Sequence, residues 1–146
     1  MDILLEGGFY SGHGMAEGNR MLLRFLLQAG HRVRIAPRDT NKRDLVLSKS
    51  EVEFLRQYEH TKLHKNELYI NNGPGWNCRI NPDFRINIGR TTFETDRLPE
   101  SWVKRLNKFT EVWVPCTFNV KTFSKAGVKV PIRVTPNFFD TTRYVP

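Results

Sequence analysis

The sequence predicts an α/β fold: a single domain in which a Rossmann-like parallel sheet carries helices on both faces. Apolar runs typical of strands alternate along the chain with segments of helical spacing. A glycine-rich turn joins the first predicted strand to the first predicted helix, which is the opening of a βαβ unit. Two helix and strand pairs follow one another in the last third, and this succession favours a parallel sheet wrapped by helices.

The first third of the chain predicts a strand, a turn, a helix and a second strand. Residues 2–6 (DILLE) are a short apolar run, and residues 7–14 (GGFYSGHG) form the turn. Met15 and several leucines then fall on one helical face, and Gly30 is placed to end the helix. Residues 31–36 alternate between apolar and basic side chains, as in a strand with one partly solvated face.

The middle third predicts one helix and two strands. Residues 38–44 are polar and loop-like. Ser50 and Glu53 have the spacing of a capping box ahead of an apolar helical stretch. Strands are predicted at residues 67–72 and 84–89, joined by a turn and a loop.

The alternation of elements is clearest in the last third. A helix is predicted to begin near Pro99, followed by a strand at residues 111–114. Thr117 can cap the next helix and Gly127 can close it. Residues 132–136 supply one more strand.

The composition agrees with one globular domain and limits its partners. The chain has 146 residues, of which 39% are hydrophobic and 26% are charged. Its net charge of +8 favours anionic partners such as phosphates, nucleic acid or an acidic membrane surface. No nucleic-acid recognition helix or aromatic stacking motif is recognised, so nucleic acid is not an expected partner. The N-terminus lacks the features of a secretory signal and no apolar stretch approaches a membrane span, which predicts a cytoplasmic protein.

Four basic residues in loops or at a helix end are candidates for contact with an acidic acceptor or with anionic lipid. They are Lys42, Arg43, Lys62 and Lys65. If they cluster, the protein would lie peripherally at a membrane surface, and the alternative is an evenly solvated surface.

The metal-binding residue types lack the spacing of a metal site. Cys78 and Cys116 are far apart and form no Cys-x-x-Cys pair, so neither a zinc site nor a disulfide framework is indicated. His60 and His64 are four residues apart but lack the glutamate that follows the first histidine in a metalloprotease motif. No metal is expected.

Two carboxylates follow the strand predicted at residues 84–89. Ligands of parallel α/β sheets bind beyond the carboxyl ends of the strands, so Glu94 and Asp96 are placed to face a ligand crevice. The alternative is structural: one of them caps the following helix or pairs with Arg90 or Arg97.

The glycine-rich turn matches neither of the common nucleotide motifs. Its last position departs from Gly-x-Gly-x-x-Gly, and His13 and Gly14 stand where a P-loop requires Lys and Ser or Thr. Glycines ahead of a helix still let a ligand approach the backbone, and the first N–H groups of the helix favour an anion. The alternative is that the glycines serve only a tight turn.

Several quoted segments resemble a known family when they are taken together. They are SGHG before a leucine-rich helix ending AGHRVRI, then FETDRLPESWVKRLNKFTEVWVPCTFNVKTFSKAGV, then VTPNFFDTTRYVP. The chain resembles the N-terminal domain of GT-B fold retaining glycosyltransferases of family 4, also called group 1 glycosyltransferases. The resemblance covers essentially the whole chain and is strongest over residues 89–146.

The resemblance implies a domain assignment and an activity. Residues 1–136 would form the Rossmann-like acceptor-side domain, and residues 137–146 would begin the linker to a C-terminal domain that holds most of the nucleotide-sugar. That second domain has no counterpart after Pro146. The implied enzyme moves a sugar from a nucleotide-sugar to a sugar or lipid-linked acceptor, without a metal or other cofactor, and this chain alone is expected to be inactive.

The resemblance also implies roles for individual residues. Retention in the family is thought to proceed by front-face attack helped by the leaving phosphate, so no protein nucleophile is required. His13 departs from the Gly-Gly found in many relatives. The implied sets are Gly12, His13 and Gly14 at the donor phosphate or sugar, Glu94 and Asp96 as catalytic carboxylates, and Thr95, Thr117 and Asn119 along the acceptor crevice.

A function without chemistry stays open beside the enzyme. The chain could be a stand-alone α/β module that recognises a phosphate-bearing ligand, since a glycine-rich helix start suits an anion in either case. A second α/β domain encoded in the same gene would decide for the transferase.

Overall fold

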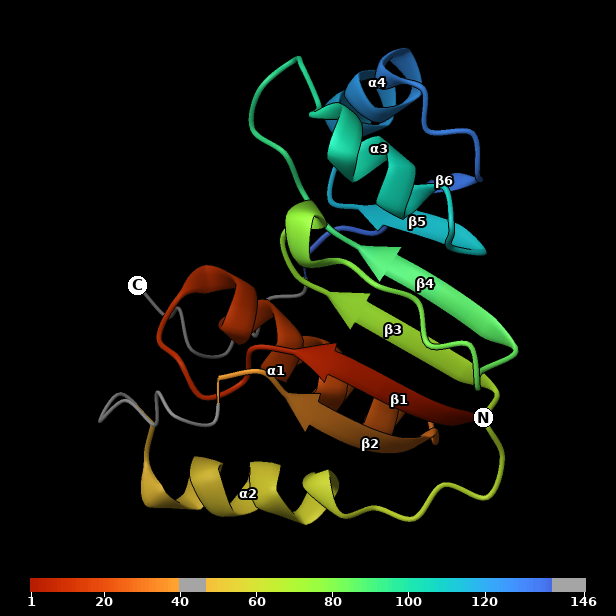
Figure 1. Cartoon of the computed structure of the whole chain (residues 1–146). Coiled ribbons are helices and arrows are strands. Elements are labelled where there is room, and N and C mark those ends of the chain that lie inside the picture. The colour runs from red at the N-terminus through yellow and green to blue at the C-terminus, as the bar shows by residue number, and fades with distance from the viewer. Residues whose placement is uncertain (40–46, 138–146) are drawn as a thin grey trace.

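A computed structural model describes residues 1–39 and 47–137 of the chain (Figure 1). Six parallel strands form one sheet in the order β2-β1-β3-β4-β5-β6, which confirms the predicted α/β class. The elements in chain order are β1 (Asp2–Gly7), α1 (Gly14–Gln28), β2 (Arg32–Pro37), α2 (Lys49–Glu59), β3 (Leu68–Asn72), the 3-10 turn η1 (Gly75–Asn77), β4 (Ile86–Arg90), α3 (Glu100–Leu106), β5 (Glu111–Val114), α4 (Thr117–Ala126) and β6 (Ile132–Val134).

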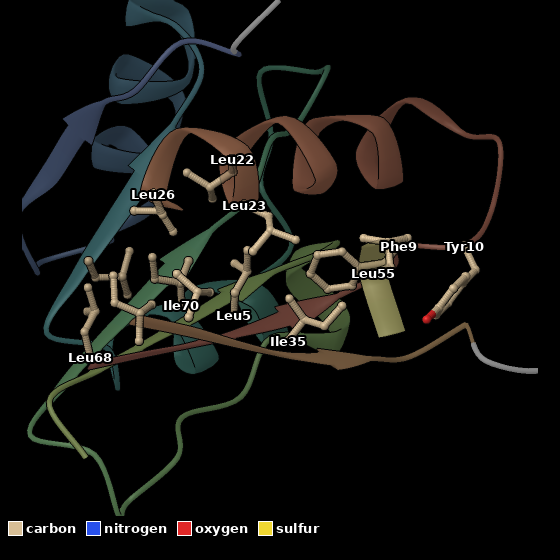
Figure 2. Close-up of a cluster of buried hydrophobic side chains, with 13 residues drawn as sticks. Leu5, Phe9, Tyr10, Leu22, Leu23, Leu26, Ile35, Leu55, Leu68 and Ile70 are labelled. Atoms are coloured by element: carbon tan, nitrogen blue, oxygen red, sulfur yellow. The ribbon is translucent and has the colours of Figure 1, made fainter. Parts of the chain in front are cut away.

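The two larger of the three hydrophobic clusters among the described residues lie on opposite faces of the sheet. The first joins α1 and α2 to the strands, and Figure 2 shows its leucine, isoleucine and aromatic side chains. The second joins α3 and α4 to β5. Val112 and Val114 belong to the second core, whereas Trp113 packs against the first. Because neighbouring side chains of a strand point to opposite faces, this alternation confirms that helices cover both faces.

The strand register brings four strand ends to one level at the carboxyl edge of the sheet. Gly7 at the end of β1 lies opposite Pro37 of β2 and Asn72 of β3. Asn72 in turn lies opposite Arg90 at the end of β4. The chain leaves β1 toward β2 on one side, while β3 and the later strands lie on the other side. The topological switch point is therefore between β1 and β3, where ligands of open α/β sheets bind.

The segment that connects β3 to β4 contains the short 3-10 turn η1. This turn packs against α3 so closely that a Cβ atom added to Gly75 would lie 2.2 Å from Cε3 of Trp102. A glycine is required here because the indole ring occupies the position of any side chain.

The N-terminal cap of α2 differs from the prediction. Ser48, not Ser50, is the N-cap, and its hydroxyl accepts the Glu51 N–H at 3.2 Å while the Glu51 carboxylate accepts the Ser48 N–H. The predicted pair of Ser50 and Glu53 was wrong because Ser48 already has the extended backbone of a cap (φ −63°, ψ 156°), so the helix begins two residues earlier.

The cap predicted for α4 is also wrong. Cys116 is the N-cap, with an extended backbone (φ −154°, ψ 166°), and Thr117 is the first helical residue. The C-terminal predictions are confirmed, because Gly30 (φ +78°) directly follows the C-cap of α1 and Gly127 (φ +102°) is the C-cap of α4. In the described parts of the chain, no helix combines the length and apolarity needed to cross a membrane.

Candidate functional site

A crevice runs along the carboxyl edge of the sheet and consists of three adjoining pockets of about 110, 300 and 330 Å³. Met15 in the first turn of α1 lines all three, so the pockets meet at the start of this helix. We name each pocket after one residue of its lining. The Arg90 pocket is lined by Gly14, Met15, Gly18, Asn72, Arg90, Thr91, Thr92, Pro115 and Asn137; the Asp39 pocket by Gly7, Gly8, His13, Met15, Arg38, Asp39, Asn72, Gly73, Pro74, Trp76 and Asn77; and the Glu94 pocket by Met15, Pro74, Thr92, Phe93, Glu94, Thr95 and Trp102.

The glycine-rich turn between β1 and α1 binds a carboxylate of the protein itself. Oδ2 of Asp39 accepts the N–H groups of Tyr10 and Ser11, both at 2.9 Å, and the Ser11 hydroxyl at 2.7 Å. Oδ1 accepts the N–H of Phe9 at 2.9 Å. Consecutive backbone N–H groups aimed at one point form an anion-binding nest, and here Asp39 supplies the anion.

The hydrogen bonds of this nest set the ionisation of Asp39. Burial by itself raises the pKa of the carboxyl. The hydrogen bonds from Phe9, Ser11 and Tyr10 outweigh burial and hold the pKa of Asp39 below its ordinary value. The carboxylate therefore remains ionised near neutral pH.

Arg20 of α1 holds the same turn through its carbonyl groups. This side chain is 6% exposed and donates from Nη1 to the carbonyl oxygens of Phe9 at 2.7 Å and Ser11 at 3.1 Å. Glu17, one turn earlier, pairs with the guanidinium. The backbone of residues 9–11 is thus held from both sides: Asp39 accepts its N–H groups and Arg20 donates to its carbonyl groups.

The predicted donor residues lie at the start of α1. His13 is the N-cap of the helix, and its Nδ1 accepts the N–H of Ala16 at 3.2 Å. Its ring lines the Asp39 pocket, and Gly14 lines the Arg90 pocket. Gly12 is exposed and lies outside the lining residues of all three pockets.

Glu94, Thr95 and Asp96 are exposed in the loop after β4. Glu94 and Thr95 line the Glu94 pocket, and Asp96 does not. The structural alternative finds no support within residues 1–39 and 47–137, because neither carboxylate forms an ion pair there and Pro99 is the N-cap of α3 without a side-chain hydrogen bond. The Glu94 carboxylate is therefore available to a ligand.

The Glu94 pocket also has an aromatic wall. Phe93 and Trp102 meet edge to face with ring centroids 4.8 Å apart. A carboxylate and a hydroxyl beside aromatic faces can bind a ring that has both hydroxyl groups and apolar C–H faces.

The two residues predicted at the start of α4 have different environments. Thr117 is exposed and lies outside the lining of the three pockets. Asn119 is 1% exposed: its Nδ2 donates to the Phe93 carbonyl at 2.6 Å, and its Oδ1 accepts the Thr92 hydroxyl at 3.2 Å. Asn119 thus supports the loop that carries Glu94 and does not face the crevice itself.

A buried polar cluster lies beneath the Asp39 pocket. Glu6 of β1 accepts hydrogen bonds from the Tyr69 hydroxyl at 2.5 Å, Arg38 Nε at 2.6 Å and Arg79 Nη2 at 2.7 Å. Burial raises the pKa of Glu6, but these partners outweigh it and lower the pKa overall. Burial and the Glu6 carboxylate raise the pKa of Tyr69 to about 12. This cluster fixes the end of β2, from which Asp39 follows.

The predicted basic patch is only partly described. Lys62 and Lys65 are exposed in the loop that leads into β3, at the edge of the sheet opposite the crevice. Lys42 and Arg43 lie outside the described residues. In the part of the chain that the structure covers, no group of three or more His, Cys, Asp or Glu side chains could hold a metal ion.

Sequence reasoning missed Asp39 and considered Arg90 only as an ion-pair partner. Asp39 carried the weak signal that it follows a strand end, and Arg90 is the last residue of β4. The pairing of β2 with β1, which the predicted βαβ unit implies, places Asp39 beside the turn after β1, but no local pattern shows that its carboxylate accepts the N–H groups of that turn.

Comparisons with models of known protein families, with curated proteins and with solved structures found no match to this chain. The resemblance to glycosyltransferases therefore stays a prediction from the sequence.

Proposed function

We propose that the chain is the acceptor-binding half of a retaining glycosyltransferase that moves a sugar from a nucleotide-sugar to a sugar or lipid-linked acceptor. The observation that supports this most is the continuity of the crevice. It connects the start of α1, which suits phosphate groups, to the Glu94 pocket, which suits a sugar ring. A group transfer between a phosphate-linked donor and a hydroxyl acceptor needs these two environments next to each other.

The chain's own residues would position the acceptor and polarise the donor. The Glu94 carboxylate would accept a hydrogen bond from an acceptor hydroxyl, and Thr95 would add a second polar contact. The ring would lie against Trp102, with its apolar face on the indole. The N–H groups at the start of α1 would bind phosphate oxygens as negative charge develops on the leaving group.

The acceptor role of Glu94 predicts a loss of turnover without a loss of stability. In the protein expressed from its whole gene, we expect Glu94→Ala to lower kcat/KM by about 10- to 100-fold, since a hydrogen bond to a charged group contributes about 1.5 to 3 kcal/mol. Asp96→Ala should have a smaller effect, because Asp96 does not line the pocket. Sugar transfer from labelled nucleotide-sugars and melting temperature are measured for each variant.

Glu100→Ala is the matched control for these variants. Glu100 is an exposed carboxylate nearby that pairs with Lys104 on α3, outside the crevice. Its replacement should leave turnover unchanged and alter stability only slightly. A Glu94 variant with full turnover, or one whose melting temperature falls with its activity, would contradict the acceptor role.

A second prediction concerns the 146-residue chain by itself. We expect it to bind nucleotide-sugars in the millimolar range or more weakly and not to transfer sugar. Contacts with a few backbone N–H groups must offset about 4 to 15 kcal/mol of lost translational and rotational freedom. Calorimetric titration tests this, and micromolar binding would show that the chain holds a more complete donor site.

The same titrations separate the enzyme from a binding module. A module without chemistry would bind a phosphate-bearing ligand tightly as the isolated chain. The protein expressed from its whole gene would then transfer no sugar from any donor of the panel. Weak binding by the chain together with transfer by the whole gene product supports the glycosyltransferase.

A further inference from the structure

The Arg90 pocket is small, positively charged and built from separate parts of the chain. It lies between the first turn of α1, the ends of β3 and β4, and Asn137. None of its nine lining residues is acidic. Its volume of about 110 Å³ is well above the roughly 10–15 Å³ that one water molecule needs. The pocket can therefore take a group of several heavy atoms.

Arg90 provides the charge of this pocket and has no anionic partner among residues 1–39 and 47–137. The residue is 6% exposed, and its Nη2 donates to the Asn137 side-chain oxygen at 2.7 Å. Nη1 reaches the Asn72 amide oxygen at 2.9 Å when that amide is turned to face it. Both acceptors are uncharged, and Nε is buried without a hydrogen bond in the described part of the chain.

An uncompensated guanidinium at this depth is energetically unfavourable. Burial lowers the pKa of Arg90, and no carboxylate among the described residues offsets that effect. The group still stays protonated, because arginine does not lose its proton in proteins. Buried charges are normally paired, so a buried arginine with only neutral partners favours an anion beside it.

Two further features of the lining suit an anion with several oxygens. The Thr91 hydroxyl is buried without a hydrogen-bond partner in the described residues. Gly14 and Gly18 lie one turn apart on α1 and expose its backbone to the pocket. The N–H groups of Gly14 and Met15 precede the first intrahelical hydrogen bonds, and this end of the helix carries partial positive charge.

We propose that the Arg90 pocket binds a phosphoryl group, with the Arg90 guanidinium as its counter-charge. A monoester phosphate has three terminal oxygens and the diphosphate of a nucleotide-sugar has four non-bridging oxygens, so either can take donors from Arg90, from Thr91 and from the start of α1. A carboxylate has only two oxygens and would leave one of these three groups of donors without an acceptor. Two sources carry this chemistry: the diphosphate of a nucleotide-sugar and the phosphate of a lipid acceptor. The choice between them rests on the proposed function, whereas the phosphoryl site does not.

The first test is titration of the chain with inorganic phosphate at constant ionic strength, followed by backbone amide NMR shifts. We expect saturable shifts at Gly14 and Gly18, and a dissociation constant at least about tenfold higher in Arg90→Gln. Arg97→Gln, which changes an exposed arginine of the same edge, should bind phosphate like the wild type. Equal affinity in wild type and Arg90→Gln, or no saturable shift, would overturn the proposal.

Gly18→Ala tests the pocket without removing a charge. Outside the backbone of α1 and among the described residues, a Cβ added to Gly18 would meet only Arg90 Nη1 within 4.0 Å, at 4.0 Å, so the methyl group enters the pocket without a clash there. Alanine is the better helix former, and the melting temperature should rise by about 2 to 4 °C. Phosphate affinity should fall at the same time, because the methyl group takes part of the space. A variant that gains stability and keeps full phosphate affinity would show that phosphate binds elsewhere.

Two further titrations distinguish the sources. Nucleoside diphosphate sugars are compared with vesicles that contain phosphatidic acid, each with wild type and Arg90→Gln. The source is the probe that wild type binds more tightly than inorganic phosphate and that Arg90→Gln binds more weakly than wild type. If inorganic phosphate binds at Arg90 and neither source binds more tightly, the phosphoryl site stands and the proposed glycosyltransferase loses this support.

Discussion

Replacing Asp39 by alanine is expected to destabilise the fold by about 2 to 4 kcal/mol. The variant leaves the N–H groups of Phe9, Tyr10 and Ser11 without their acceptor, and each unsatisfied buried donor costs about 1 to 3 kcal/mol. Water can reach part of the turn through the Asp39 pocket and hydrate some of these groups. The loss of unfolding free energy is therefore smaller than the summed cost of three unsatisfied N–H groups. Denaturant unfolding at neutral pH measures the loss.

Asp39→Asn keeps an acceptor oxygen of the same reach and removes the charge, so it should lose about half as much stability, roughly 1 to 2 kcal/mol. The pKa of Asp39 is lowered in the folded chain, so its ionised form stabilises the fold above the unfolded pKa of about 3.9. This contribution is lost as pH falls through the lower folded pKa. The difference between wild type and Asp39→Ala should therefore shrink below about pH 4, and an unchanged difference at pH 3 would contradict the role of the charge.

Glu6→Gln is expected to have an equal or larger effect, a loss of about 3 to 5 kcal/mol. The amide nitrogen of glutamine would face one of the donors on Tyr69, Arg38 and Arg79, and the partly buried Arg38 guanidinium would lose its counter-charge. Because the lowered pKa of Glu6 makes this stabilisation acid-sensitive, it is present above the unfolded pKa and lost as pH falls through the folded one.

Arg79→Ala is the control for the Glu6 variant. It removes a partner of the same carboxylate whose side chain is 68% exposed, so it should cost no more than about 1 kcal/mol. Unfolding free energies of both variants between pH 3 and pH 8 separate the buried from the exposed contacts. Similar losses in the two variants would show that the cluster is held by solvent-accessible charge alone.

The fold class could be predicted because its signals are local. The apolar alternation of β2, the leucine spacing of α1 and the glycines after α1 and α4 each depend on a few neighbouring residues, and each is confirmed. The caps of α2 and α4 were less certain because Ser48 and Ser50, or Cys116 and Thr117, stand close together. The choice between them depends on the path by which the chain enters the helix.

The candidate site was predictable only where it lies next to a strand end. Glu94 lies four residues after the end of β4, so its place in the crevice could be expected from the edge rule for parallel sheets. Asp39 contacts a turn 28 to 30 residues away; the predicted βαβ unit implies that β2 lies beside β1, but no local pattern shows that the Asp39 carboxylate accepts the N–H groups of that turn. Arg90 was visible at the end of its strand, but its burial depends on packing of α1 and Asn137 against it.

The contact of Gly75 with Trp102 determines which parts of the crevice can move. The indole ring occupies the space where a side chain at position 75 would stand, so the turn η1 and helix α3 form one mechanical unit. Pro74, next to this turn, and Trp102 both line the Glu94 pocket. A ligand that pushes against one of them must displace the other as well. We therefore expect any opening or closing of the crevice around a ligand to come from other segments, because a displacement of this wall would move η1 and α3 together.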